Sequence, residues 1–276
     1  MKKHSGSQVW AVAILISLTA GTVALAQATD DGTADILRRA MRYQLQFRAG
    51  QMDSIPEYVA MLEEATKADA DNADLWNAMG VAYLAQAARA MMPGGKPAEA
   101  IQAIQKGPAA LERALQLNPN HAEALATHGG MQALMGSFFQ KSPAVTANGV
   151  AEMNRAIELA PRSRRVRLQR AFSGINLPDA IRNRAAEAED LDFLITLTSG
   201  TRAGDYIRLM RGDLYVETGS NDLAREQYEV VVKSTSPAGT NAKSRLAALD
   251  QGGIPTADIR KLRQAAGANC VMCHGK

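Results

Sequence analysis

Aromatic side chains make up only 5% of this 276-residue sequence, and the chain has two cysteines and a formal net charge of +3. Few aromatic and β-branched residues disfavour β-sheets, because these residues fill the pleated surface of strands. Alanine, leucine, glutamine, glutamate and arginine are abundant, and they favour helices. With 46% hydrophobic and 21% charged residues, the chain is too apolar for a disordered protein and too polar for a multi-span membrane protein. The composition therefore predicts a folded, all-α protein.

The N-terminus reads as a separate segment. Two lysines precede an uncharged stretch over residues 4–29, and the small-residue sequence Ala24-Leu25-Ala26 lies near its end. This order is typical of a secretory signal peptide, with cleavage after Ala26 or after Ala28. Polar residues dilute the stretch below what a ~20-residue membrane-spanning helix needs, although an uncleaved membrane anchor stays open as an alternative. We expect residues 1–26 to be removed and the protein to be periplasmic. Its remaining charge of +1 gives no argument for nucleic-acid binding.

Two stretches place large, small and aromatic residues at helical spacing. Residues 75–83 read Leu-Trp-Asn-Ala-Met-Gly-Val-Ala-Tyr, so that Trp, Met, Gly and Tyr fall on one helical face. Gly80 on this face would let a partner helix come close. Residues 211–231 extend the pattern over a helix, a turn at Gly219 and a second helix.

These two stretches resemble the tetratricopeptide repeat (TPR), a helix pair that ends in the spacing Ala-x4-Pro, here called an alanine step. Such steps occur at Ala114 and Ala156, and at Ala65 with another alanine in place of the proline. The resemblance implies an all-α, right-handed solenoid of about five helix pairs over residues 33–250. Stacked repeats of this kind present a concave surface that binds proteins or peptides.

The three steps are separated by 49 and 42 residues instead of the usual 34. We place the first excess in the proline- and glycine-rich residues 90–97, as a loop between the two helices of one pair. The second excess falls near residues 135–148. Residues 162–199 have room for a further, degenerate pair before the well-matched pair at residues 211–231.

The sequence carries no motif of a common enzyme class. It has no Gly-x-Ser-x-Gly, no phosphate-binding loop and no His-Glu-x-x-His. We therefore expect a binding protein and not an enzyme.

One charged patch stands out within the repeats. An acidic run over residues 187–192 follows five arginines in nine residues, Arg162, Arg164, Arg165, Arg167 and Arg170. A solvated face paired with the acidic run is the simpler interpretation. A docking surface for an acidic partner, or for the carboxylates of a cofactor, is the alternative, because arginine binds carboxylates in a bidentate manner.

The C-terminal residues 251–276 form a third segment. Residues 251–255 predict a flexible break, and Thr256 can cap a short helix over residues 257–266. Ile259, Leu262 and Ala266 give this helix one apolar edge.

The chain then continues as Cys270-Val271-Met272-Cys273-His274, which is the Cys-x-x-Cys-His attachment motif of c-type haem. Two thiols three residues apart lie about one helical turn apart, so each can add to one haem vinyl group while the imidazole ligates the iron. We expect one covalent haem c, with Cys270 and Cys273 as thioether residues and His274 as the proximal iron ligand.

Only two residues follow this motif, whereas cytochromes c continue into the helices and the methionine that cover the haem. We therefore expect no self-contained cytochrome domain, and a haem that is exposed or is covered by the repeats, a second copy or a partner. His128, His121 and Met92 are candidates for the distal ligand. His128 and Gln132 occupy packing positions of the third unit, so each needs a hydrogen-bond partner or a ligand. A hydrogen-bonded His128 inside the helix layer is the simpler interpretation.

Two functions compete from the sequence, beside the simpler alternative of an ordinary scaffold whose Cys-x-x-Cys-His tail is incidental. The first is an exported repeat scaffold whose haem serves electron transfer or docking with a periplasmic redox enzyme. The second is a TPR adaptor in cytochrome c maturation, which binds apocytochrome peptides and carries no haem itself. For the two cysteines, a disulfide or redox-active pair is a further alternative.

Overall fold

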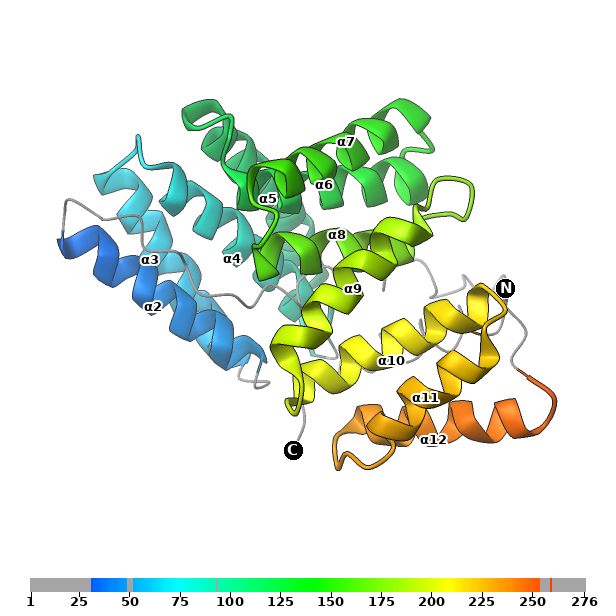
Figure 1. Ribbon diagram of the computed structural model, residues 1–276. Helices are drawn as coiled ribbons and strands as arrows, with labels where there is room; N and C mark the ends of the chain where they lie inside the picture. The colour runs from blue at the N-terminus through cyan, green and yellow to red at the C-terminus, as the bar shows by residue number, and fades with distance from the viewer. Residues whose placement is uncertain (1–30, 49–51, 93, 254–258, 260–276) are drawn as a thin grey trace, which may run out of the picture. The chain divides into compact units, whose positions relative to one another are not determined.

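The computed structural model describes residues 31–48, 52–92, 94–253 and 259, and its regular elements are helices (Figure 1). These described residues form eleven α-helices and contain no strand, which confirms the expected fold class. No helix within them is long and apolar enough to span a membrane. The expected signal peptide and the Cys-x-x-Cys-His motif lie outside the described residues.

The chain divides into two compact units, of residues up to 182 and residues from 183. Unit 1 contains α2 (Asp31–Arg48), η2 (Met52–Ser54), α3 (Ile55–Ala68), α4 (Ala73–Met91), α5 (Pro97–Leu117), α6 (Ala122–Leu134), η3 (Met135–Phe139), α7 (Pro143–Leu159) and α8 (Arg164–Asn176). Unit 2 contains α9 (Arg184–Thr198), α10 (Arg202–Glu217), α11 (Asn221–Val231) and α12 (Pro237–Asp250). The helices expected over residues 162–199 both form, but α8 belongs to unit 1 and α9 to unit 2.

The three alanine steps mark equivalent positions in α3, α5 and α7. Ala65, Ala114 and Ala156 each lie three residues before the end of their helix and are buried. The carbonyl of each accepts a hydrogen bond from the backbone N–H four residues later, at 2.9, 2.9 and 3.0 Å. The repeat register predicted from the sequence is therefore confirmed at these three helix ends.

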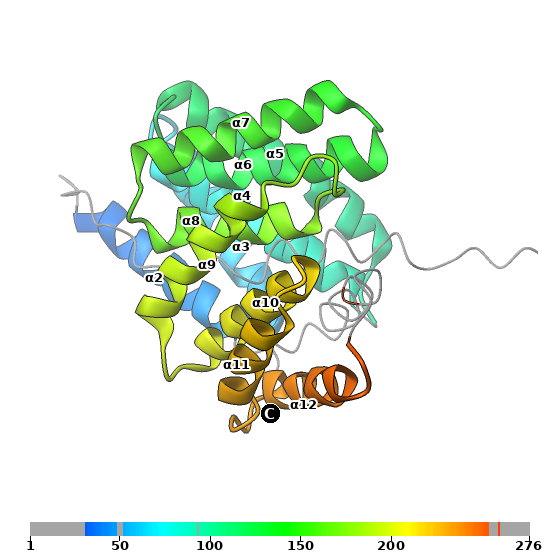
Figure 2. The ribbon, with the colours of Figure 1, turned by 45° about the vertical axis from the view of Figure 1, so that its right-hand side comes forward.

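Small residues bring the helices of a pair together. A side chain added at Gly80 of α4 would lie 2.6 Å from the Leu111 Cγ of α5, as the sequence predicted for this position. Gly212 of α10 likewise faces the ring of Tyr228 on α11. Helices α6 and α7 run side by side in both ribbon views (Figure 2), and at Gly129 and Gly149 an added side chain would meet the backbone of the other helix.

Both predicted insertions fall between the two helices of a pair, but they differ from the expected boundaries. Helix α4 continues to Met91, so the first connection is shorter than residues 90–97. The second insertion is taken up by the π-helix η3 at Met135–Phe139 and a short turn before α7. A π-helix accommodates an extra residue without ending the helical backbone.

The core of unit 1 is lined by aliphatic residues and tyrosines. Leu62, Leu75, Met79 and Leu111 are at most 1% exposed and belong to one cluster. Trp76 packs against this cluster from α4, and its indole N–H donates to the Ala70 carbonyl at 2.8 Å.

Unit 2 has a charged pair in its core. The guanidinium of Arg245 on α12 donates to both carboxylate oxygens of Asp213 on α10, at 2.6 and 2.9 Å. The Tyr228 hydroxyl of α11 donates to the same carboxylate at 2.7 Å. All three residues are at most 1% exposed, so the pair ties α10, α11 and α12 together. Removing one partner of such a pair would leave an uncompensated buried charge.

We expect Gly149→Ala to lower the free energy of unfolding by about 1–2 kcal/mol. The added methyl would lie 2.4 Å from the Gly129 carbonyl and from the Ala133 nitrogen, and backbone atoms cannot rotate aside. This overpacking outweighs the gain of about 1 kcal/mol that alanine brings to a helix interior. Urea denaturation followed by circular dichroism measures the change. Asn148→Ala at the exposed neighbouring position is the control, and equal stability of the two variants would contradict the close approach.

Candidate functional site

The residues expected to bind haem, Cys270, Cys273 and His274, lie outside the described residues. In the part of the chain that the structure describes, no group of three or more histidine, cysteine, aspartate or glutamate side chains could hold a metal ion. The described site residues are therefore the histidines and charged groups of the helix pairs.

His128 lies on α6 between carboxylates of two other helices. It is 5% exposed, and its Nδ1 lies 2.7 Å from Oε2 of Glu152 on α7. Its Nε2 lies 3.3 Å from the amide of Gln132 and 3.7 Å from Oε1 of Glu112 on α5. This geometry agrees with a histidine that is hydrogen-bonded inside the helix layer. The assignment of His128 as a distal iron ligand stays a prediction.

The surroundings of His128 favour its charged form. Burial alone lowers its pKa, but the hydrogen bond to Glu152 and the charges of Glu152 and Glu112 outweigh burial and raise the pKa above 6.5. When it is protonated, the ring can pair with Glu112 on α5 and with Glu152 on α7, and it then links these two helices to α6.

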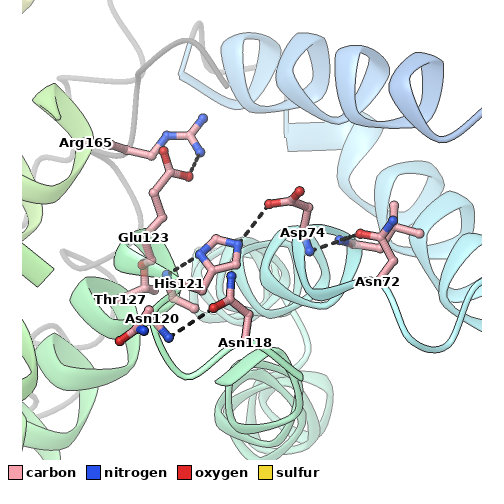
Figure 3. Close-up of polar contacts among 10 residues, drawn as sticks. Asn72, Asp74, Asn118, Asn120, His121, Glu123, Thr127 and Arg165 are labelled. Atoms are coloured by element: carbon pink, nitrogen blue, oxygen red, sulfur yellow. Dashed lines mark hydrogen bonds and ion pairs between the residues drawn. The ribbon is translucent and has the colours of Figure 1, made fainter. Parts of the chain in front are cut away.

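A second histidine connects two successive helix pairs at the start of their first helices (Figure 3). His121 caps α6, because its Nδ1 accepts a hydrogen bond from the backbone N–H of Ala124 at 3.3 Å. The proton is then on Nε2, which donates to Oδ1 of Asp74 on α4 at 3.0 Å. This hydrogen bond outweighs burial and lowers the pKa of Asp74. Asn72 caps α4 beside it by accepting from the N–H groups of Asp74 and Leu75. Like His128, His121 is engaged in the helix layer.

The first turn of α6 also contacts α8. Arg165 of α8 forms an ion pair with Glu123, as Figure 3 shows. Two other arginines of the predicted cluster have partners within unit 1: Arg167 donates to the Pro161 carbonyl at 2.6 Å and Arg170 donates to Asn154 at 3.2 Å. The cluster is thus partly used to attach α8 to α6 and α7.

One residue of the predicted acidic run has a partner in unit 2. Asp192 of α9 accepts two hydrogen bonds from Arg211 of α10, at 2.7 and 3.0 Å. The guanidinium carbon of Arg211 also lies 3.8 Å from the ring centroid of Tyr215. A bidentate pair that is also stacked fixes the arginine more firmly than a lone surface ion pair does. The direct pairing of the arginine cluster with the acidic run stays a prediction.

The sequence analysis did not predict three of these side-chain contacts, because their partners lie far apart in the chain. His121 and Asp74 are 47 residues apart, Arg165 and Glu123 are 42 apart, and Arg245 and Asp213 are 32 apart. The position of two acidic residues in their helices could have indicated such contacts. Asp74 and Glu123 both lie in the first turn of the first helix of a pair, where repeat stacking brings successive turns together.

Comparison with known proteins supports the repeat fold. One matching solved structure is a thermophilic TPR protein from Thermus thermophilus, at 14% identity and a TM-score of 0.50, covering 85% of this chain and 97% of that one. Another is a tetratricopeptide repeat protein from Parabacteroides merdae, at 18% identity and a TM-score of 0.47, covering 91% and 82%. No family model and no curated protein matches the chain. The first of these structures, together with the described helix pairs, supports a TPR-like fold for this protein.

We expect Glu152→Gln to lower the free energy of unfolding by about 1–2 kcal/mol near pH 6, because it removes the charged partner of His128. A raised pKa in the folded state stabilises the protein below pH ~6.5, and this stabilisation is lost as the pH rises through the folded value. The difference between wild type and variant should therefore shrink towards pH 9. Urea denaturation at both pH values measures it.

Glu158→Gln is the matched control, because Glu158 lies on the same helix but is exposed and pairs with Arg155. The His128 pKa, followed by NMR titration of its ring proton, should fall in Glu152→Gln and stay constant in Glu158→Gln. An equal loss of stability at pH 6 and pH 9 would show that Glu152 acts through packing and not through the charge of His128.

Proposed function

We propose that this protein is an exported, TPR-like binding scaffold that carries one covalent c-type haem and acts as an electron-transfer or docking subunit of a periplasmic redox partner. The observation that carries the proposal is the complete motif at Cys270, Cys273 and His274. Its two cysteines are the only ones in a chain whose N-terminus reads as an export signal, and export leads to the compartment where bacteria attach haem to protein.

The two thiols and the imidazole of the motif fit the chemistry of c-type haem. Cys270 and Cys273 would each add across one vinyl group, with the sulfur bonding to one vinyl carbon and the thiol hydrogen going to the other. The imidazole of His274 would supply a nitrogen ligand to the iron. When bound, the haem supplies a one-electron iron couple, and the protein supplies attachment, orientation and access.

The repeat fold supports a binding role for the remainder of the chain. Stacked helix pairs offer an extended surface in which each pair contributes side chains at equivalent positions, and such surfaces bind proteins or peptides. The links at His121 and Arg165 hold successive first helices of unit 1 in register, which gives a partner a pre-organised surface. We assign the choice of partner to this surface and the redox chemistry to the haem.

We expect the wild-type protein, expressed in the periplasm of a host with working cytochrome maturation, to keep haem on a denaturing gel. Peroxidase staining should mark its band, and the intact mass should exceed that of residues 27–276 by one haem. Cys270→Ser with Cys273→Ser should abolish the staining, because both thioether bonds are lost. His274→Ala should lower or shift the haem absorbance, because the proximal ligand is removed.

Met272→Leu is the matched control, since it alters the motif between the cysteines but leaves all three haem-binding residues in place. It should stain like the wild type. Circular dichroism should show the same helicity in every variant, and a loss of helicity in the cysteine variant would contradict a motif that is separate from the repeat fold. An unstained wild-type band at the plain polypeptide mass would overturn haem carriage and favour the maturation adaptor.

A further inference from the structure

Two adjacent phenylalanines are exposed at the connection between α6 and α7. Phe138 is 36% exposed and Phe139 is 46% exposed, although the sequence contains only five phenylalanines. Both belong to η3, and the connection lies at an edge of unit 1 in both ribbon views (Figures 1 and 2). Apolar residues scattered singly over a surface need no explanation, whereas two adjacent aromatic rings form a patch that would gain free energy by leaving water.

The connection is an ordered turn that is bonded to itself and packed on α7. The backbone N–H of Gln140 donates to the Met135 carbonyl at 2.9 Å. The backbone N–H of Ser142 donates to the Gly136 carbonyl at 2.8 Å. A β-carbon at Gly136 would lie 2.6 Å from the Thr146 nitrogen, so the turn contacts the backbone of α7 directly. The two rings are therefore presented by a closely packed turn and not by a loose loop.

The connection carries a positive charge and no negative charge in its own sequence. Residues 124–151 contain no aspartate or glutamate, and the exposed Lys141 follows Phe139 by two residues. Lys141 has φ of +52°, in the left-handed region that lysine seldom adopts, so the turn holds this residue in an uncommon backbone conformation. The other ionisable side chain of the stretch, His128, is buried beside its carboxylates.

The size and charge of the patch distinguish between two kinds of partner. A phenylalanine side chain offers about 200 Å², so the exposed fractions of these two rings amount to about 150–200 Å². A stable protein interface needs about 800 Å² on each side and a partner of matching shape. A lipid bilayer needs no matching pocket, because apolar side chains enter the boundary between headgroups and acyl chains while a lysine attracts anionic headgroups. The patch therefore fits a lipid surface better than a protein.

We propose that the α6–α7 connection is a membrane-binding tip, which inserts Phe138 and Phe139 into the surface of an anionic lipid bilayer while Lys141 contacts the headgroups. Binding through one such tip is weak and reversible, because its apolar surface is far smaller than that of a membrane-spanning helix. The proposal is independent of the haem, since the tip and the motif at residues 270–274 are different parts of the chain.

Cosedimentation with sucrose-loaded vesicles tests the tip. The full-length chain is expressed for export, and its intact mass shows whether residues 1–26 remain. Vesicles of equal parts phosphatidylglycerol and phosphatidylcholine supply the anionic surface, and vesicles of phosphatidylcholine alone supply the neutral one. We expect Phe138→Ser with Phe139→Ser to lower the partition coefficient on anionic vesicles at least about tenfold, because two rings no longer leave water. Lys141→Gln should lower it about fivefold on anionic vesicles and leave it unchanged on neutral ones.

Leu223→Ser with Val230→Ser is the matched control, since it removes two aliphatic side chains of α11 that are 41% and 49% exposed. This variant should bind like the wild type. Phe138→Leu with Phe139→Leu should keep most of the binding, because leucine is also apolar. Far-ultraviolet circular dichroism checks that each variant keeps its helicity, and the leucine variant and Lys141→Gln still decide if the serine variant loses it.

Phe139→Trp reports the insertion directly. The emission that this residue adds to that of the wild type should shift to shorter wavelength on anionic vesicles, and brominated lipids should quench it. A wild type that stays in the supernatant with anionic vesicles would overturn the lipid-binding tip. Equal binding by the wild type and the serine variant would also overturn it, and would assign the binding to another part of the chain.

Discussion

Close approach of helix backbones is the constraint on which the rest of this structure depends. Gly129 and Gly149 put α6 and α7 in contact where no β-carbon fits, and Gly80 and Gly212 allow the side chains of Leu111 and Tyr228 to fill the remaining space. A chain with few aromatic residues has little bulk with which to fill wider gaps, so its helices must be near one another to exclude water. The abundance of alanine in its helices serves the same purpose.

Polar contacts then specify which turns lie opposite each other. Apolar packing alone tolerates sliding of one helix along another, but the carboxylates around His128 and the pair between Arg245 and Asp213 satisfy each other in one register only. In unit 1 these contacts connect α6 to α7 of its own pair and to α5 of the preceding pair, and in unit 2 they connect α12 to the preceding pair. Within each unit, charged groups therefore fix the register between neighbouring helices, and small residues allow those helices to pack closely.

The local sequence pattern was enough to predict the fold, several helix faces and helix ends, and the close approach at Gly80. The stripe at residues 75–83 and the alanines at 114 and 156 identified helix faces and helix ends, because these depend on the 3.6-residue period. The π-helix at Met135–Phe139 escaped prediction, since a single wider turn leaves the apolar spacing almost unchanged. His128 was recognised as a polar residue in a packing position, but its partner Glu152 could not be named, because that depends on how two helices are placed along each other.

Trp76 gives the molecule a built-in spectroscopic probe. The other tryptophan, Trp10, lies in the segment expected to be removed on export, so the mature chain would emit from unit 1 alone. Tryptophan fluorescence would then follow the unfolding of the first helix pairs, while far-ultraviolet circular dichroism would follow both units together. The difference between the two signals would separate the stability of the N-terminal repeats from that of the repeats next to the haem motif.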